Sequence, residues 1–352
     1  MNLNAGSKRR VRNAFLWASR GVGLFRLSRR VTRKGLRILC YHGFGDSEET
    51  LFRPKLFIRT ATFEQRLRTL RSQGYNILGL ESALKAMRQG SLPECATVIT
   101  IDDGFHSTFQ RASPLLAKFD FPATVYVTTY YCQHQNPIFR LLVQHVFWKT
   151  SKQQLDLPEG LCTFNGCFPL GEARKKDELM WKLNDWGERE CSETDRVVLA
   201  KGIAELLEVD VSGIVLDRTF HIMSADEVRS LAQKGVDIQL HTHRHRFPAG
   251  EDGAREIRDN KAVLEPLVRK QLRHFCYPSG EWNERCWPIL QSEAIASATT
   301  CERGLNYART PALALKRFLD SEDVSQLEFD AEVAGYMEIL RRIRGWLKHR
   351  MS

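Results

Sequence analysis

Strand-like runs of β-branched and aromatic residues alternate with helical patterns along most of this chain. The strand-like runs lie at 37–42, 97–101, 123–127, 236–240, 273–277 and 296–300. Helical spacing marks 62–74, 113–118, 254–270 and 284–293, with Thr62 and Gly74 expected to cap and end the first helix. Strands that alternate with helices form parallel βα units. The sequence therefore predicts an α/β fold, either a barrel or an open doubly wound sheet.

The regular alternation lapses between Tyr130 and about Phe220. This stretch is richer in charge and reads as helical, most clearly from Val197 to Leu207. We interpret about 131–220 as a mostly helical insertion that caps one side of the barrel, with its tryptophans in a small core of its own. The expected domains are a basic segment at 1–35, a barrel at 36–330 and a basic helix at 331–352.

Two clusters of chemically active residues each follow a predicted strand. Asp102-Asp103-Gly104 follows the run at 97–101, and His241-Thr242-His243-Arg244-His245 follows the run at 236–240. A parallel α/β barrel places its active site at the carboxyl ends of its strands. Scattered structural histidines would have no reason to gather there.

These residue types suit a mononuclear metal hydrolase. One carboxylate and two imidazoles can hold a zinc-like ion with a position open for water, and the second carboxylate can act as a base. Two histidines four residues apart also occur by coincidence on a helix face. Their place after a strand, together with the adjacent carboxylates, favours metal-assisted hydrolysis.

The motifs resemble those of the polysaccharide deacetylases, also called carbohydrate esterase family 4, over most of 36–320. The segment 100–104 is similar to the family's Thr-Phe-Asp-Asp-Gly motif, and 241–245 matches its His-Ser/Thr-x-x-His motif in full. The segment 275–280 resembles a third motif, in which Arg usually replaces Cys276 and Tyr replaces Ser279. Tyr41-His42 resembles the opening motif of the exopolysaccharide-processing branch. The resemblance implies a distorted parallel (β/α) barrel of about seven strands.

The resemblance also implies roles for individual residues. Asp103, His241 and His245 would hold a divalent ion, zinc or a similar metal, with Thr242 orienting a ligand. Asp102 would be the general base that takes a proton from the attacking water. A backbone N–H near Ser279 would help to hold the oxyanion. The implied reaction removes an N-acetyl group from an amino sugar in a polysaccharide, an oligosaccharide or a lipid-linked glycan.

Two departures from the family pattern concern the general acid and the partner of the base. The late family motif usually supplies a histidine, whereas 313–318 contains none. First and last strands are neighbours in a closed barrel, so His42 is a candidate acid, with a buried structural histidine as the alternative. Arg317 is a candidate partner of Asp102 in place of the missing arginine, or else the member of a surface ion pair. His106 would be the next candidate for the acid.

Other functions stay open at this point. A deformylase of a lipid-linked amino sugar would need the same residues. A catalytically silent barrel that binds glycans would explain the missing histidine and arginine, and a membrane-surface scaffold for polysaccharide assembly would explain the basic ends. The complete set of metal ligands argues against the last two.

The net charge of +10 arises at the amino end of the chain. Residues 1–37 hold 11 basic residues and no acid, and the remainder carries 41 basic against 42 acidic residues. Apolar residues such as Phe15, Trp17 and Leu27 accompany this charge, and the segment 341–350 repeats the pattern. An anionic membrane surface is one expected partner, and a basic helix that packs on the barrel or is solvated is the alternative. No nucleic-acid motif is present.

The cysteines and the early apolar residues bear on the expected location. Nine cysteines, an odd number without a Cys-x-x-Cys pair, indicate reduced thiols rather than a disulfide framework. Arg20 and Arg26 interrupt the early apolar residues, which argues against a secretory signal. We expect a cytoplasmic protein that is peripheral to the inner face of the membrane.

Overall fold

The computed structural model describes residues 5–351, which fold into two compact units. The barrel unit comprises the described residues up to Gly104, Thr108–Thr129 and those from Glu227 onward. The inserted unit comprises Phe105–Ser107 and Tyr130–Asp226. Residues 1–4 and 352 lie outside the described residues, and the expected boundaries at 1–35, 36–330 and 331–352 stay predictions.

Seven parallel strands form a half-barrel in the order β11-β10-β9-β6-β5-β1-β12, and β4 pairs with β5 beside this path. The predicted distorted parallel barrel is confirmed. The strands are β1 (Arg37–Tyr41), β4 (Asn76–Ile77), β5 (Ala96–Ile101), β6 (Ala123–Val127), β9 (Asp237–Leu240), β10 (His274–Cys276), β11 (Ser297–Thr299) and β12 (Phe318–Leu319).

The first and last strands of the half-barrel are neighbours. Leu39 of β1 pairs with Phe318 of β12. On the other side, a single bridge joins Thr299 of β11 to Leu315, in the segment that leads to β12. The segment 313–318 therefore lies between β11 and β1, and it brings Arg317 close to β1.

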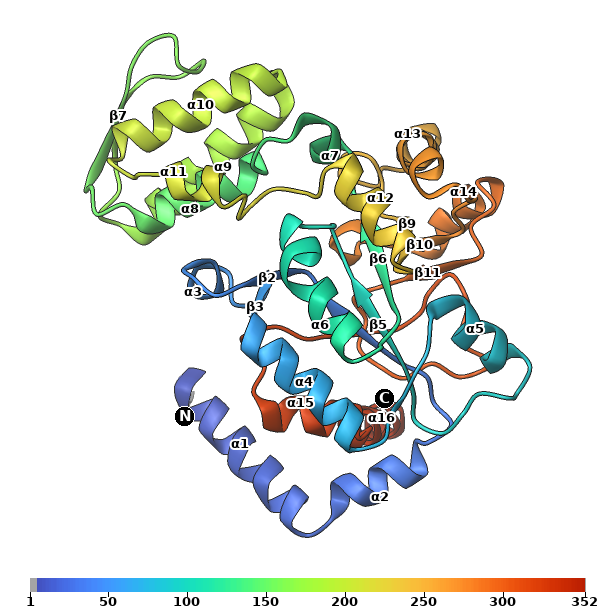
Figure 1. The fold of residues 1–352 in the computed structure, drawn as a ribbon. Helices are drawn as coiled ribbons and strands as arrows, with labels where there is room; N and C mark the ends of the chain where they lie inside the picture. The colour runs from blue at the N-terminus through green and yellow to red at the C-terminus, as the bar shows by residue number, and fades with distance from the viewer. Residues whose placement is uncertain (1–4, 352) are drawn as a thin grey trace. The chain divides into compact units, whose positions relative to one another are not determined.

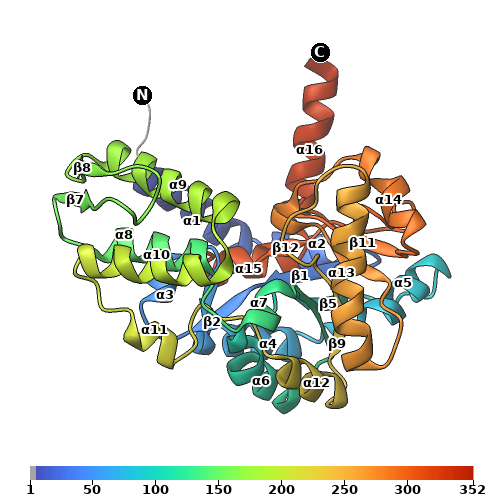
Figure 2. The same ribbon diagram turned by 90° about the horizontal axis from the view of Figure 1, so that it is seen from above.

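Helices cover the outside of the sheet, so the strands are buried on both faces (Figures 1 and 2). Every residue of β5 and β6 is buried, so these strands lack the alternation of buried and exposed side chains found in a sheet with one solvated face. The helices are α3 (Glu49–Phe52), α4 (Thr60–Ser72), α5 (Leu80–Arg88), α6 (Ser113–Lys118), α12 (Ala225–Gln233), α13 (Glu251–Val268), α14 (Trp287–Ser292) and α15 (Gln326–Val333), with terminal helices α1 (Ala5–Gly21), α2 (Leu24–Val31) and α16 (Tyr336–Met351).

Some local expectations were wrong. Thr62 lies inside α4, which begins at Thr60 after the extended residue Arg59. Helix α5 and the short parallel pair β2 (Gly43–Gly45) and β3 (Phe57–Arg59) had no counterpart in the predicted pattern. These elements are short, and tertiary packing rather than periodicity determines them.

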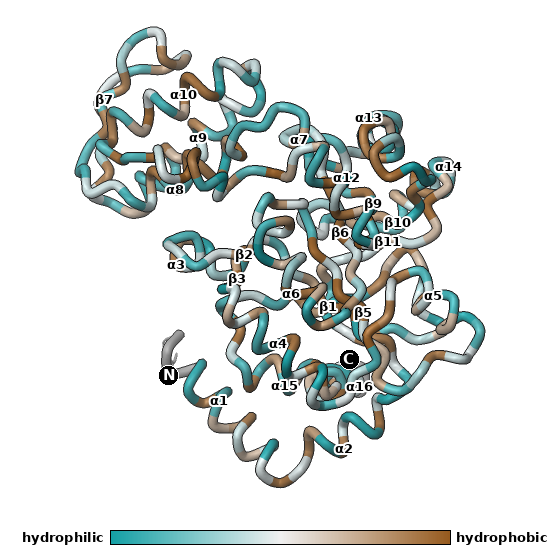
Figure 3. The backbone as a smooth tube through the Cα atoms, viewed as in Figure 1, coloured by the Kyte–Doolittle hydropathy of each residue, from teal (hydrophilic) through white to brown (hydrophobic). Residues whose placement is uncertain are grey.

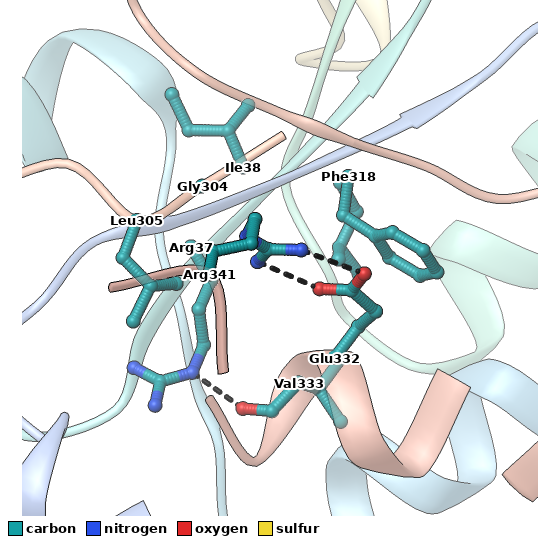
Figure 4. A pocket seen from close by; sticks show the side chains of 9 residues that line it. Arg37, Ile38, Gly304, Leu305, Phe318, Glu332, Val333 and Arg341 are labelled. Carbon is teal, nitrogen blue, oxygen red and sulfur yellow. Dashed lines mark hydrogen bonds and ion pairs between the residues drawn. The ribbon is translucent and has the colours of Figure 1, made fainter. Parts of the chain in front are cut away.

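The amino end of β1 is closed by side chains (Figure 4). Arg37 is fully buried and donates from Nε to the carbonyl of Val333 at 2.6 Å. Arg341 pairs with Glu332 beside it, at 3.0 Å. The cavity between them holds about 10 Å³, room for about one water molecule, so it is too small for a sugar.

The inserted unit has a hydrophobic core of its own. It contains α7 (Tyr130–His134), α8 (Phe139–Lys149), the antiparallel pair β7 (Gln154–Leu157) and β8 (Gly166–Pro169), α9 (Ala173–Glu190), α10 (Glu193–Leu206) and α11 (Ser212–Leu216). The buried residues of its core cluster lie between Phe139 and Val209. Trp186 packs against this core, whereas Trp148 and Trp181 are exposed, so only one of the three tryptophans behaves as expected.

Candidate active site

The sequence motifs occupy the loops after β5, β9 and β10, at the carboxyl edge of the half-barrel. Each loop holds a non-glycine residue in the left-handed region: Asp103 (φ 66°), Thr242 (φ 64°) and Ser279 (φ 56°). Such residues cost about 1–3 kcal/mol each and persist only where the surroundings hold them. Strain of this kind on all three loops marks this edge as a candidate functional site.

Gly104 shows why the first loop turns where it does. Its φ is 81°, and a Cβ at this position would lie 3.0 Å from Val127. Only glycine combines this conformation with such a close approach. The turn is pinned by the Asp102 N–H, which donates to Tyr41 O at 2.8 Å, and by the Thr128 N–H, which donates to Asp103 O at 3.1 Å.

Asp103, His241 and His245 converge. Asp103 Oδ1 lies 3.1 Å from His241 Nε2 and 3.2 Å from His245 Nε2. Burial alone would raise the pKa of Asp103, but the hydrogen bonds from the two histidines hold it well below its usual value. Burial likewise acts to lower the pKa of His241, and the Asp103 hydrogen bond raises it above its usual value.

The donor set of these three residues fits a divalent ion. His241 Nδ1 lies 2.8 Å from the Cys276 carbonyl and donates its proton there, so Nε2 is the nitrogen that faces Asp103 Oδ1. A proton on Nε2 makes the hydrogen bond to Asp103, and a cation between the two atoms would take the place of that proton, with the Nε2 lone pair as its ligand. In the next residue along the chain, Thr242 Oγ1 is buried with no hydrogen-bond partner among the described residues. Neutral imidazole with carboxylate is the ligand set of zinc and similar metals.

Two other groups could bring three ligand atoms together, Cys40-His42-Asp102 and Asp102-His241-Cys276. Both include Asp102, whose two oxygens already face a guanidinium. A second positive charge beside that guanidinium is disfavoured. The group around Asp103 is therefore the better metal site among the described residues.

Asp102 forms a buried ion pair with Arg317. Nη1 and Nη2 of Arg317 each lie 2.7 Å from one carboxylate oxygen, and Arg317 is completely buried. Burial raises the pKa of Asp102, but the charge and hydrogen bonds of Arg317 outweigh it and hold the pKa far below its usual value. From the sequence, Arg317 is a candidate partner of Asp102, and the structure contains this contact.

Two thiols complete the surroundings of this ion pair. Cys276 Sγ lies 3.3 Å from Asp102 Oδ2 and 3.2 Å from Arg317 Nη2, and Cys40 Sγ lies 3.4 Å from the same oxygen. Cys276 stands where the family pattern usually has arginine. Its small side chain leaves the space into which Arg317 reaches from the segment before β12.

His42 and Ser279 lie on neighbouring parts of the same edge. His42 follows β1, is partly buried, and places Nε2 3.8 Å from Asp102 Oδ2, beyond hydrogen-bond distance. Ser279 is exposed in a short turn, Pro278–Gly280, after β10. The bonds of that turn are donated by Gly280 and Glu281, so neither uses the Ser279 N–H.

Helix α13 holds the loop 241–245 through residues that the motifs in the sequence did not indicate. Asn260 is fully buried, accepts from the His241 N–H at 3.0 Å, and donates to Val127 O and Thr129 Oγ1, both at 3.0 Å. Glu256 accepts from the Arg244 N–H at 2.8 Å. A usable signal existed, because Asn260 interrupts the apolar face of Ile257 and Leu264 at helical spacing.

The remaining histidines of the motif region are not ligands of this group. His243 is buried, and its ring lies 2.8 Å from Thr129 Oγ1, which agrees with a packed residue. His106 belongs to the inserted unit. Beside His245, a shallow hollow of about 360 Å³ is lined by Arg244, Arg246, Pro248, Asp252, Arg255 and Glu256.

Comparisons with known proteins identify relatives of this chain in sequence and in fold. A family profile described as polysaccharide deacetylase matches residues 208–296. YxkH of Bacillus subtilis (strain 168), itself assigned to the polysaccharide deacetylases, is 33% identical over 302 residues, which cover 85% of this chain and 76% of that protein. Poly-beta-1,6-N-acetyl-D-glucosamine N-deacetylase of Escherichia coli (strain K12) is 37% identical over 67 residues, 19% of this chain and only 10% of the relative.

Solved structures share the fold. The Streptococcus pyogenes deacetylase PplD, in complex with acetate, superposes with a TM-score of 0.57 at 18% identity, covering 86% of this chain and 99% of that one. IcaB from Ammonifex degensii gives 0.53 at 17% identity, covering 85% and 97%. Fold and site together thus define a deacetylase-type half-barrel. The chain belongs to the polysaccharide deacetylase family.

Proposed function

We propose that this protein is a metal-dependent hydrolase that removes N-acetyl groups from an amino sugar in a polysaccharide, oligosaccharide or lipid-linked glycan. One observation carries the proposal: Asp103, His241 and His245 converge within 3.1–3.2 Å contacts, next to the Asp102–Arg317 pair. Membership of the deacetylase family supports the reaction class. The name of the Escherichia coli relative supports an N-acetylated glycan as substrate.

Asp103, His241 and His245 would hold the ion, and zinc suits their donor atoms best. When bound, such an ion supplies a Lewis acid for the acetyl carbonyl and lowers the pKa of water. Asn260 holds the His241 backbone, and the Cys276 carbonyl orients the His241 ring for this task. His245 is half-exposed, which leaves the site open to a large glycan.

Asp102 would take the proton from the attacking water. The pairing with Arg317 keeps Asp102 ionised at all ordinary pH values, but it also makes the carboxylate a weak base. A weak base can only deprotonate a water molecule that has itself been made acidic. The depressed pKa of Asp102 therefore agrees with a reaction that depends on a metal.

His42 and Ser279 would complete the reaction. His42 would protonate the nitrogen of the leaving amino sugar, because its Nε2 lies near Asp102 at the rim of the site. The Ser279 N–H would donate to the oxyanion. The products are acetate and a free amino sugar. The cytoplasmic location expected from the cysteines stays a prediction.

The test combines metal analysis with product release. Purified protein is assayed for bound metal, and for acetate and formate release from β-1,4- and β-1,6-linked N-acetylglucosamine oligomers and from lipid-linked sugars. Asp103→Ala, His241→Ala and His245→Ala should each lose metal and activity. Asp102→Asn should keep metal but lose turnover by about 10²–10⁴-fold, the usual contribution of a general base.

His134→Ala is the matched control, because His134 is an exposed histidine of the inserted unit. It should keep both metal and activity. Full metal content in the His245→Ala variant, or acetate release by metal-free protein, would contradict the proposal. Formate release without acetate release would change the acyl group and leave the metal site intact.

A further inference from the structure

Exposed apolar side chains gather at the two ends of the chain. Sixteen large hydrophobic residues are exposed among those the structure describes. Seven lie on α1, α2 and their connection, and three lie near the end of α16; in the barrel unit only Leu51 adds to them. Concentration of this kind marks an interaction surface rather than ordinary surface composition.

The α1–α2 pair is not loosely attached. Leu16 and Phe25 are buried in a cluster with Leu327, Ala331 and Tyr336, and Ser19 Oγ lies 2.8 Å from Tyr336 Oη. On the same side, arginines of α1 form ion pairs with acids of the 323–330 segment: Arg9 with Asp323, Arg12 with Glu328 and Arg20 with Asp330. One face of the pair is therefore fixed against the barrel unit.

The opposite face is apolar. We call it the outer face and define it by its exposed large side chains, Val11, Phe15, Trp17, Val22, Leu24, Leu27 and Val31. Phe15 and Trp17 lie at its margins, because the Phe15 ring is 6.2 Å from the Tyr336 ring and the Arg20 guanidinium is 5.6 Å from the Trp17 ring. Val22 and Val31 are 75% and 65% exposed, whereas Leu16 on the packed side is only 2% exposed. On α2, Leu24, Leu27 and Val31 recur at helical spacing (i, i+3, i+7). Figure 3 shows hydrophobic and hydrophilic residues alternating along both helices.

Positive charge borders the outer face. Arg10, Arg26 and Arg30 are exposed, and no ion pair joins them to an acid within the described part of the chain. No acidic residue precedes Asp46 in the sequence. Arg26 and Arg30 are four residues apart, which places them on one flank of α2. An apolar stripe with cations along its edge is the pattern of a helix that lies in a membrane interface.

We propose that the outer face of α1–α2 docks on the surface of an anionic phospholipid membrane. The apolar side chains would enter the boundary between headgroups and acyl chains, and the arginines would contact lipid phosphates. None of the described helices is long and apolar enough to cross a membrane. The proposal is independent of the catalytic function.

The charge pattern favours a lipid surface over a second copy of the chain. A symmetric dimer through this face would bring the same unpaired arginines of two copies together, with no acid to compensate them. The end of α16 adds Ile343, Trp346 and Leu347, all exposed, between basic residues. In Figure 2 this end of α16 projects away from the other elements of the barrel unit. Tryptophan at such a position is typical of membrane interfaces.

The test measures co-sedimentation of the full-length protein with vesicles. Phosphatidylglycerol–phosphatidylcholine vesicles are compared with pure phosphatidylcholine, at salt of about 0.1 M and about 1 M, where the screening length falls from ~10 to ~3 Å. We expect binding to anionic vesicles at low salt and much weaker binding in the other conditions. Brominated acyl chains should quench the fluorescence of the intact protein more than that of Trp17→Phe.

Two sets of substitutions address the two parts of the surface. Each lipid-facing arginine typically contributes about fivefold to partitioning, so removing three should cost at least tenfold. A similar loss is expected for the apolar set. The basic set is Arg10→Gln, Arg26→Gln and Arg30→Gln, and the apolar set is Val11→Ser, Val22→Ser, Leu27→Ser and Val31→Ser. Deletion of the helices is avoided, because it would uncover Leu327 and Ala331.

Matched controls change the same residue types on the inserted unit. Exposed apolar residues there are replaced by Val198→Ser, Val215→Ser and Leu216→Ser, and exposed cations by Arg174→Gln, Lys175→Gln and Arg189→Gln. These variants should bind vesicles like the intact protein. Absence of binding by the intact protein, or equal binding by the outer-face variants, would refute the proposal. So would a change from dimer to monomer in the apolar set, with vesicle binding unaltered.

Discussion

Arg317 and Asp102 form the most demanding contact of the site at the scale of single residues. Their two parallel hydrogen bonds of 2.7 Å lie in the interior, and Arg317 Nε also donates to Thr300 O at 2.9 Å. Removing one member of a buried pair usually costs about 3–5 kcal/mol, because the other charge stays uncompensated. The planar fork of arginine is needed for both bonds, and lysine cannot supply it.

The small residue Cys276 makes this arrangement possible, which leads to a rescue prediction. Arg317→Ala should lower turnover strongly and destabilise the fold. Adding Cys276→Arg to Arg317→Ala restores a guanidinium from β10, at the position where the family usually has it, and should recover activity to within about tenfold of the intact protein. Activity on N-acetylated oligomers and thermal unfolding are measured together.

The controls separate charge from geometry. Arg317→Lys keeps the charge but only one of the two bonds, so it should fall between the intact protein and Arg317→Ala. Among these variants, Cys276→Arg alone should have the lowest free energy of unfolding, because it buries two guanidinium groups around one carboxylate. Full activity in Arg317→Ala would refute the idea that Arg317 takes the place of the arginine that the family usually has at position 276. So would a folded double variant that is no more active than Arg317→Ala.

His42 carries the second prediction at this scale, as the general acid. His42→Ala should keep metal and substrate affinity but lose turnover of the amide. An acetyl ester whose leaving group needs no proton should be hydrolysed almost normally, because only departure of the leaving group is impaired.

The pH–rate profile gives an independent reading of the same variant. A general acid must carry a proton to act, so the loss of activity on the basic side of the profile should vanish in His42→Ala. Equal losses with ester and amide would instead make His42 a structural residue. If His42 only packed against Asp102, His42→Ala would slow hydrolysis of the ester and of the amide to the same extent.

At the scale of elements, the strands were predictable and the supports of the site were not. The β-branched runs at 97–101 and 123–127 coincide with β5 and β6 almost residue for residue, because fully buried parallel strands leave a continuous apolar signal. Adjacent motifs at strand ends likewise indicated Asp103, His241 and His245. By contrast, β12 contains only Phe318–Leu319, too short for any periodic pattern.

The interactions that orient the site join residues far apart in the sequence. Asn260 on α13 reaches back to His241 and to Val127, a separation of 133 residues. Cys276 faces Arg317 across 41 residues. Local patterns report which face of an element is buried, but they do not report which buried polar groups meet. Pairing of Arg317 with Asp102 was foreseeable only because β1 and β12 had to be neighbours in a barrel.

At the scale of the whole molecule, the inserted unit is separable from the catalytic half-barrel. The buried residues of its core cluster lie between Phe139 and Val209. Where the chain enters and leaves this core, the Ile138 N–H donates to Phe220 O at 2.8 Å, so the two crossing segments are adjacent. A short linker can therefore join them without stretching the chain.

The final prediction follows from this separation. Replacing 139–219 with a short Gly-Ser linker should leave a folded half-barrel that binds metal at Asp103, His241 and His245, since all three ligands and their support from α13 lie in the barrel unit. The shortened protein should hydrolyse a small N-acetylated sugar at a rate close to that of the intact protein. If the insertion helps to bind long chains, the KM for a polymeric substrate should rise while kcat changes little. Loss of metal or of the cooperative unfolding transition on excision would show instead that the half-barrel depends on the inserted unit to fold, because a lost binding surface alone would leave both intact.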